Sequence, residues 1–462
     1  MAGGLMQLVA YGAQDVYLTG NPQITFFKVV YRRHTNFAIE SIELGFTGNP
    51  KFGSKSTCTI SRNGDLVSNM LLQVVLGRTT PLSGLPTSWA WSSYLGHRIV
   101  DFVEIEIGGT RIDKQYGDWL HLWNQLTLPK SKEEGYNKMI GHTPGVIGKK
   151  ALNSTGTVAT SATTVEDYQI ATGGAGTIIP LDASDTAPIV LNIPLQFWFC
   201  RNPGLALPLI ALQYHDVKLS VRFRSLRDCM QDYTDKKFIA TATDAASSAN
   251  GNVSFEANLF VDYIHLDTDE RRRFAQLTHE YLIEQVQYVE EQRTDSSIKL
   301  GLPFNHPIKE LVWTVSDDAA SAAGEHYNYV GAVTNNPMNP GAQANIYSVI
   351  GRQDGVNMCK DAVLKLNGQD RFSQRDGTYF NLIQPYQHHT RIPYTGINSY
   401  SFALRPEEHQ PSGTCNFSRL DSATLHMSIN TGASNEYTVR AYAVNYNVLR
   451  IMSGMGGLAY SN

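Results

Sequence analysis

Four histidines toward the C-terminal end form the densest group of side chains in this sequence that could bind a metal. His388 and His389 are adjacent, and His409 and His426 follow them. Imidazole nitrogens are common ligands of zinc, so a zinc site is the first chemistry to consider. We take the adjacent pair to lie on a strand, where neighbouring side chains point to opposite faces of the sheet. We therefore expect packing or surface roles for these histidines and predict no metal site.

The motifs of common catalytic sites are incomplete or missing. The segment "GHTPGVIGKKA" (141–151) contains a Gly-Lys pair, but a phosphate-binding loop needs glycine in place of Thr143 and serine or threonine in place of Lys150. The segment "DTDE" (267–270) lacks the glycine and the terminal glutamate of a calcium loop. Neither G-x-S-x-G nor H-E-x-x-H occurs. The sequence does not place two carboxylates across a cleft, as a glycosidase requires. We predict no catalytic residue, no cofactor and no enzyme activity.

Three N-x-S/T patterns could accept a glycan, at Asn153, Asn252 and Asn416. Asn153 and Asn252 lie in stretches rich in small polar residues and are the two candidates for attachment at the surface. The first residues have neither the basic part nor the apolar part of a secretory signal, so we favour chance for all three.

The composition is that of a globular protein rich in turns and strands. Of the 462 residues, 42% are hydrophobic and 17% are charged, which is below the usual ~25%. The net charge of −4 argues against nucleic acid or an anionic membrane as the main partner. No apolar run approaches the ~18 residues of a membrane-spanning helix. Five scattered cysteines without a C-x-x-C pair predict free thiols in a reducing compartment.

Strand patterns dominate the chain, and helical patterns are few. The clearest helix is expected at 116–126. Short spans that alternate or run apolar, rich in β-branched and aromatic residues, predict strands at 37–46, 66–76, 99–107, 209–223 and 255–266. Many strands with irregular connections indicate an all-β protein built from sandwiches.

The sequence also repeats itself. The segment "VEIEIGGTRIDKQYGDWL" (103–120) has a close relative in "AVLKLNGQDRFSQRDGTYF" (362–380), and three further matches follow the same order along the chain. The offsets between the matched segments are 241, 259, 205 and 182 residues, and they change only across stretches rich in Ala, Ser, Thr and Gly. The other matches are 59–75 with 300–315, 195–199 with 400–404 and 255–264 with 437–446, and the inserted stretches are 151–177, 241–252 and 316–345. Four matches in order predict two homologous β domains.

Each copy has room for about eight strands, which in two facing sheets make a jelly roll. We predict an all-β fold of two consecutive eight-stranded antiparallel jelly-roll sandwiches, with long surface loops and few short helices. Arg271, Arg272 and Arg273 lie beside acidic residues, so we favour a solvated linker over a nucleic-acid contact. The expected parts are an N-terminal arm (1–25), a first jelly roll (26–266), a linker (267–276), a second jelly roll (277–451) and a C-terminal tail (452–462).

Several long segments resemble the major capsid proteins of large icosahedral double-stranded DNA viruses, of the algal phycodnavirus and amoebal marseillevirus kind. They are "MAGGLMQLVAYGAQDVYLTGNPQITFFKVVYRRHTNFAIE" (1–40), "NPGLALPLIALQYHDVKL" (202–219), 267–285, 366–393, 402–421 and 445–462. The resemblance spans the chain except for the inserted stretches.

The resemblance implies a structural protein of the virion. Three chains would form a homotrimeric capsomer with a pseudo-sixfold outline, because two similar domains in three copies give six similar corners. Neighbouring capsomers, minor capsid proteins, penton proteins and the internal viral membrane are the implied partners. The inserted stretches would form outward towers, and the chain would fold and assemble in the host cytoplasm.

Two alternatives remain open at this stage. Jelly rolls also occur in glycan-binding and glycan-cleaving proteins, which would need an aromatic-lined groove with paired carboxylates. A minor capsid component of the same fold is the second alternative. The segment "QITFFKVVYRRHTNF" (23–37) combines apolar and basic residues, so it either anchors the protein on the inner side of the shell or enters the first sandwich as a strand.

Overall fold

The computed structural model describes the following residues: Met6, 9–10, 12–21, 34–78, 89–142, 188–232, 253–318, 326–331, 356–430 and 436–460. The chain divides into two compact units, Met1–Phe37 and Ala38–Asn462. In the first unit the described helix is α2 (Asp15–Thr19). The expected towers at 151–177 and 241–252, residues 319–325 and 332–345 of the tower at 316–345, residues 143–150 and residues 23–33 lie outside the described residues.

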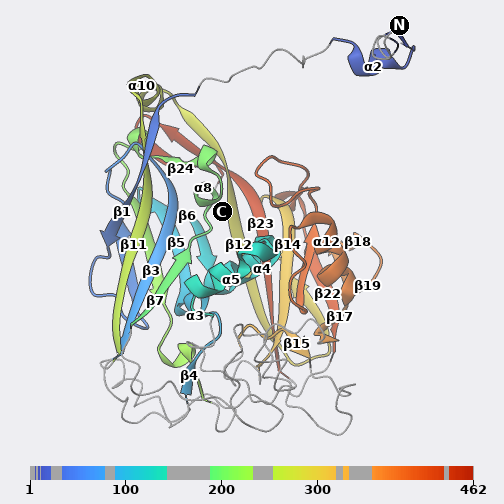
Figure 1. Ribbon diagram of the computed structural model, residues 1–462. Helices are drawn as coiled ribbons and strands as arrows, with labels where there is room; N and C mark the ends of the chain where they lie inside the picture. Colours follow the sequence, from blue (N-terminus) through green and yellow to red (C-terminus); the bar gives the residue numbers. More distant parts are fainter. Residues whose placement is uncertain are drawn as a thin grey trace. The chain divides into compact units, whose positions relative to one another are not determined.

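Eight strands of the first copy form two facing antiparallel sheets (Figure 1). Alternating apolar residues of both sheets meet between them and form a continuous core. In spatial order, the first sheet contains β1 (Phe37–Gly45), β11 (Val253–Leu266), β3 (Leu66–Arg78) and β7 (Ile189–Pro194), and the second contains β2 (Lys55–Thr59), β9 (Val217–Phe223), β5 (Val100–Ile107) and β6 (Thr110–Tyr116).

Eight strands of the second copy repeat this order around a core of their own. The two sandwiches stand side by side with their long strands running in similar directions (Figure 1). The first sheet contains β12 (His279–Arg293), β23 (Tyr437–Met452), β14 (Pro307–Asp317) and β20 (Ile397–Ser401), and the second contains β13 (Ser297–Gly301), β22 (Ala423–Ile429), β17 (Cys359–Leu366) and β18 (Gln369–Asp370). The predicted double jelly roll is confirmed.

Short elements complete the described part of the chain. The helices are α3 (Leu95–Ile99), α4 (Gly117–Thr127), α5 (Lys130–Met139), α8 (Trp198–Arg201), α10 (Thr268–Gln276) and α12 (Gln384–His388), with a π-helical turn η5 (Tyr379–Ile383) directly before α12 and 3-10 turns η1 (Pro203–Leu205), η2 (Leu209–Ala211), η3 (Arg227–Cys229) and η6 (Phe417–Arg419). The short strands are β4 (Trp89–Trp91), β8 (Leu207–Pro208), β10 (Met230–Asp232), β15 (Val330–Gly331), β16 (Val356–Asn357), β19 (Arg375–Asp376), β21 (Cys415–Asn416) and β24 (Met455–Leu458). None of the described helices has the length and apolar character needed to cross a bilayer.

Strand register confirms the internal repeat at single-residue level. In the first copy, Leu72 on β3 pairs with Leu259 on β11. At the offsets expected from the sequence these residues correspond to Trp313 and Ala441, which pair in the same way on β14 and β23. The pairing of β3 with β7 and of β14 with β20 follows the same offsets.

The repeated hairpin has the same turn in both copies. Gly108 and Gly109 have φ of 57° and 80°, and Asn367 and Gly368 have φ of 51° and 79°. Two successive residues with positive φ form the turn that matches the right-handed twist of a two-residue hairpin, and Gly and Asn are the residues that tolerate it. This requirement explains why the repeat is clearest here.

One predicted strand is shorter than expected. In 209–223 the strand begins only at Val217, and residues 209–211 form the turn η2. Leu209 and Leu212 are buried in the first core, and the backbone N–H of Ile210 donates to the carbonyl of Asp65. The segment is therefore apolar because it is a buried turn, which periodicity alone does not distinguish from a strand.

All five cysteines are free thiols, as predicted. Burial raises the pKa of the Cys58 thiol to about 11 and that of Cys200, Cys229 and Cys359 to about 12. Because the thiolate is the nucleophilic form, the thiols at these four positions are poor nucleophiles.

The close approach of α4 to β5 yields a stability prediction. A Cβ at Gly117 would collide with the carbonyl oxygens of Val100 and His97, whereas a Cβ at Gly135 on exposed α5 meets open space. We expect Gly117→Ala to destabilise the fold by about 1–3 kcal/mol and Gly135→Ala to stabilise it by about 0.5–1 kcal/mol. Urea denaturation checks both variants. Equal unfolding midpoints for Gly117→Ala and the wild type would contradict the close contact.

Candidate functional site

Equivalent sheets in the two copies differ in burial. We call β12-β23-β14-β20 the covered sheet and β1-β11-β3-β7 the open sheet. On β14 both faces are buried, with Trp313 in the core and Val312 on the outer face. On β3 burial alternates, with Leu72 fully buried and Leu71 only half-buried. The outer face of the covered sheet thus has a cover that the outer face of the open sheet lacks.

Helix α4 of the first copy provides part of that cover. It begins at Gly117 and carries an apolar face at helical spacing, formed by Trp119, Leu122, Trp123 and Leu126. These side chains pack with Val312, Tyr442 and Val444 on the covered sheet, and the Trp119 and Tyr442 rings lie 5.4 Å apart. Leu120, on the opposite side of the helix, is buried in the first core. The helix therefore joins the two sandwiches.

A segment of the second copy closes over the same helices. The Arg391 guanidinium lies 2.6 Å from the carboxylate of Glu133 on α5, and the Tyr394 hydroxyl donates to the same carboxylate at 3.1 Å. The backbone N–H of Arg391 donates to the carbonyl of Leu126. Burial by itself raises the pKa of Glu133, but Lys130 and Arg391 outweigh it, so this pKa lies below its ordinary value. The contact is charged and largely buried, although Nη1 of Arg391 has no hydrogen-bond partner in it.

His389 belongs to this junction, and the expectation that it lies on a strand is wrong. His388 ends α12, and His389 follows as its C-cap. The His389 ring is buried, 3.2 Å from a carboxylate oxygen of Glu310 and 3.1 Å from one of Glu407. Burial alone would lower the pKa of His389, but the two carboxylates outweigh it and raise this pKa to about 9. The neighbouring His388 is half-buried and contacts the carbonyl of Leu404.

The other two histidines lie elsewhere. The His409 ring is 3.8 Å from Glu284, and His426 on β22 contacts the hydroxyl of Thr424. Across the described ranges no group of three His, Cys, Asp or Glu side chains is arranged to hold a metal ion. The structure does not bring the four histidines together.

A buried ionic cluster, which the sequence did not reveal, also spans the two copies. The Glu284 carboxylate on β12 lies 2.7 Å from the Lys309 ammonium and 2.9 Å from the Arg201 guanidinium of α8. Burial raises the pKa of Glu284, but Arg201, His409 and Lys309 together lower it to about 2. Lys309 and Glu284 both belong to the second copy, so separating the sandwiches would remove only the Arg201 guanidinium from this buried carboxylate.

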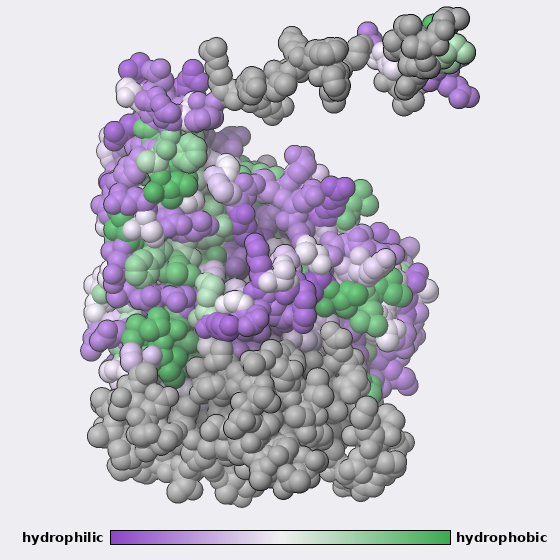
Figure 2. All heavy atoms as spheres, in the orientation of Figure 1, coloured by the Kyte–Doolittle hydropathy of each residue, from purple (hydrophilic) through white to green (hydrophobic). Residues whose placement is uncertain are grey.

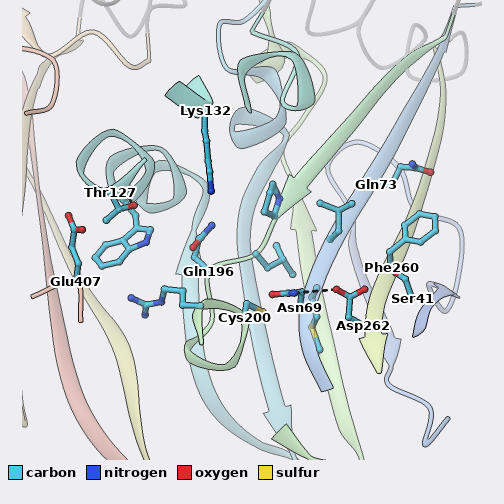
Figure 3. A pocket seen from close by; sticks show the side chains of 16 residues that line it. Ser41, Asn69, Gln73, Thr127, Lys132, Gln196, Cys200, Phe260, Asp262 and Glu407 are labelled. Carbon is cyan, nitrogen blue, oxygen red and sulfur yellow. Dashed lines mark hydrogen bonds between the residues drawn. The ribbon is translucent and has the colours of Figure 1, made fainter. Parts of the chain in front are cut away.

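Two hollows border the junction. The larger, which we call the sheet groove, has a volume of about 840 Å³ and lies between the outer face of the open sheet and the helices α4 and α5 (Figure 3). Leu71, Gln73 and Phe260 line it on the sheet side, and Trp123, Thr127 and Lys132 line it on the helix side.

The smaller hollow, of about 580 Å³, lies between the sandwiches and is lined by charged residues. Asp118 and Glu290 come from different copies, and Arg440 pairs with both, at 4.0 Å and 3.4 Å. Arg224 also pairs with Asp118 at 3.3 Å. Two more carboxylates line this hollow: Asp101, which pairs with Arg222 at 3.4 Å, and Asp228, which accepts a hydrogen bond from the Ser225 hydroxyl.

Histidines of the first copy form a second buried group that sequence reasoning missed. His97 contacts the Tyr136 hydroxyl at 2.8 Å, and the rings of Tyr94 and His142 stack 3.7 Å apart. Burial lowers the pKa of His97 to about 3. These histidines are widely spaced in the sequence, so no local pattern marks them.

The glycan candidates Asn153 and Asn252 lie outside the described residues. Asn416 is described and exposed, and its side-chain oxygen accepts a hydrogen bond from the backbone N–H of Ser418.

Comparisons with known proteins agree on one family. Residues 270–457 match the model of the large eukaryotic DNA virus major capsid protein, and residues 25–267 match that of the major capsid protein N-terminus. The chain is 47% identical to the major capsid protein of Phaeocystis pouchetii virus and 40% identical to that of Paramecium bursaria Chlorella virus 1, with 100% of both chains covered in each case.

Solved structures show the same relationship. The fold matches that of PBCV-1 VP54, with a TM-score of 0.72 and 35% identity over 95% of this chain and 100% of the other. It also matches the Faustovirus major capsid protein with a TM-score of 0.67, over 97% and 96% of the two chains, although the identity is only 15%. The second likeness concerns the fold alone.

The buried His389 predicts a loss of stability at alkaline pH. Its pKa rises from 6.5 to about 9 on folding, so its contribution is fully present below pH 6.5 and is lost as the pH rises through 9. We expect His389→Gln to flatten the pH dependence of the urea midpoint between these values, and the half-buried neighbour serves as the control in the variant His388→Gln. Parallel curves for the wild type and His389→Gln would refute the assignment.

The buried His97 predicts the opposite behaviour in acid. Its pKa falls from 6.5 to about 3 on folding, so the stability present above pH 6.5 is lost as the pH falls toward 3. Asparagine cannot be protonated in this range. We therefore expect the free energy of unfolding to fall less on acidification in His97→Asn than in the wild type. Urea midpoints measured from pH 7 to pH 4 check this, and an equally steep loss in the variant is the contrary outcome.

Proposed function

The chain belongs to the major capsid protein family of large eukaryotic DNA viruses, and we propose that three copies of it form each building block of an icosahedral shell. The observation that carries this proposal is the internal repeat. Two sandwiches with the same strand order are fixed in one compact unit. Three such chains around a threefold axis present six similar corners, and closed cyclic symmetry is the usual solution for identical subunits.

The rigid junction supports the same proposal. A unit that tiles a lattice must hold its two corners at a fixed spacing, and a flexible linker between the sandwiches would not do so. The long strands β12 and β23 reach from the second core into the first, where Ile283, Leu449 and Ile451 are buried. The apolar face of α4 and the pair of Arg201 with Glu284 fix the relative orientation.

We keep the domain boundaries 1–25, 26–266, 267–276, 277–451 and 452–462 as part of the proposal. The two family matches end at 267 and begin at 270, and α10 occupies Thr268–Gln276 between β11 and β12. The arginines of the linker lie on α10, where Arg271 pairs with Asp65 at 3.0 Å. This contact favours the structural role of Arg271 over a nucleic-acid contact.

The proposed partners are further copies of the chain, minor capsid and penton proteins, and the internal viral membrane. Assembly in the host cytoplasm is proposed because all five thiols are free. We propose that the protein acts by assembly and not as an enzyme. Glycan cleavage is disfavoured because three of the four carboxylates that line the smaller hollow, Asp101, Asp118 and Glu290, pair with arginines. Similarity to major capsid proteins over the full length disfavours a minor component.

The mass in solution tests the proposed trimer. We expect the purified full chain to form a trimer of about 154 kDa, three times the 51.2 kDa chain, by light scattering coupled to gel filtration. Because specific interfaces bury about 1,200 Å² or more, the trimer should persist at micromolar concentration. A monomer or a dimer at that concentration would overturn the proposal.

Truncation tests the role of the N-terminal arm. If residues 1–25 anchor the protein on the inner side of the shell, deleting them should leave trimers intact and reduce the yield of closed particles. Gel filtration measures the first property and electron microscopy of assembly reactions the second. Normal particles from the truncated chain would show that the arm is dispensable.

A further inference from the structure

Two apolar surfaces have no cover within the described part of the chain. One is the outer side of η5 and α12, where Leu382, Ile383 and Tyr386 are 45%, 46% and 77% exposed. The other is the outer face of the open sheet, where Ile39 and Val190 are 58% and 45% exposed. Figure 2 shows hydrophobic residues among hydrophilic ones on the side that carries β1, β11 and β3 and again on the side that carries α12.

The first surface is the counterpart of the apolar face of α4. Both helical segments follow the repeated hairpin, and both begin at a glycine, Gly117 or Gly377, at which a Cβ would collide with the carbonyl of Val100 or Cys359. Three residues later, Leu120 and Phe380 are each buried in the core of their own sandwich. Counted from the two glycines, Leu122, Trp123 and Leu126 correspond to Leu382, Ile383 and Tyr386. The residues that α4 buries are therefore the ones that η5 and α12 leave exposed.

The second surface is the counterpart of the surface that α4 covers. Val312 pairs with Tyr442 on the covered sheet, and both are buried beneath α4. At the repeat offsets they correspond to Leu71 and Phe260, which pair with each other on the open sheet. Leu71 and Phe260 are half-buried and line the sheet groove (Figure 3).

We infer that η5 and α12 of one copy dock on the outer face of the open sheet of the next copy, so that the contact between chains repeats the contact within the chain. The inference rests on the proposed trimer and names the surfaces that form it. The helix–sheet contact is directional, because one partner offers the helix and the other the sheet. Such head-to-tail contacts must close into a ring or continue as a filament, and three chains with two corners each close the ring.

A second copy of this chain fits the open sheet better than another partner does. Within the chain, helix α4 follows the hairpin of the first copy and packs on the covered sheet of the second copy. The segment η5–α12 follows the hairpin of the second copy, and the open sheet has the same strand order as the covered sheet. Within one chain the two free surfaces lie on opposite sides of the body (Figure 1), so α12 cannot cover the open sheet of its own chain. A neighbouring copy supplies the missing helix without any further component.

Charge substitutions on the helix test the inference. The double variant Ile383→Glu/Tyr386→Glu alters two exposed side chains, and Met455→Glu on β24, where Met455 is 51% exposed, is the matched control. Loss of a central apolar anchor raises a dissociation constant about 30-fold or more, so we expect the double variant to run as a folded monomer where the wild type and the control are trimers. Circular dichroism verifies the fold of each variant.

Cross-linking tests the contact without weakening it. Ile383→Cys combined with Phe260→Cys should yield covalent dimers and trimers with a short reagent that joins two thiols, whereas each single variant should not. If the wild type is not a trimer, the proposed function fails. If the wild type is a trimer but the charged variant stays trimeric and the cysteine pair is not cross-linked, the proposed function stands and this inference is overturned.

Discussion

A β-sheet with apolar side chains on both faces needs a cover on each face, and this requirement organises the whole molecule. In the covered sheet, Trp313 faces the core of the sandwich, and Val312 and Tyr442 face outward. Helix α4 brings Trp119 and Trp123 onto that outer face and at the same time remains attached to the first core through Leu120. The hydrophobic effect thus holds two separately closed sandwiches together, because separating them would expose both surfaces to water.

Buried charges give the junction its geometry. Apolar packing is tolerant of small shifts, whereas an ion pair taken out of water requires its partner at a defined distance. The pairs of Glu284 with Arg201 and of Glu133 with Arg391 each join residues of different copies. We infer that these pairs mainly fix the relative orientation of the sandwiches and add less to the stability of the folded chain. A subunit that must fit a lattice repeatedly has a use for such a fixed orientation.

Local chemistry made much of the fold predictable from the sequence. The hairpin is recognisable in both copies because its turn needs positive φ. The strand offsets match because the paired strands keep the same register in both copies. The segment at 209–223 and the position of His389 could not be predicted, since a buried turn and a short helix end carry no clear period. The roles of Glu284, Glu310 and His97 were also hidden, because their partners lie far away in the sequence. The expected towers at 151–177 and 241–252, most of the one at 316–345, and the glycan candidates Asn153 and Asn252 fall outside the described residues.

The account depends on one claim above the others, namely that the helix–sheet contact inside the chain is used again between chains. A cryo-electron microscopy map of the assembled particle that resolves side chains is the most direct measurement. The account predicts that Leu382 and Ile383 of each copy lie against Leu71 and Phe260 of its neighbour, at three equivalent positions around the capsomer. A map in which those side chains face solvent while the subunits meet through other surfaces would contradict it.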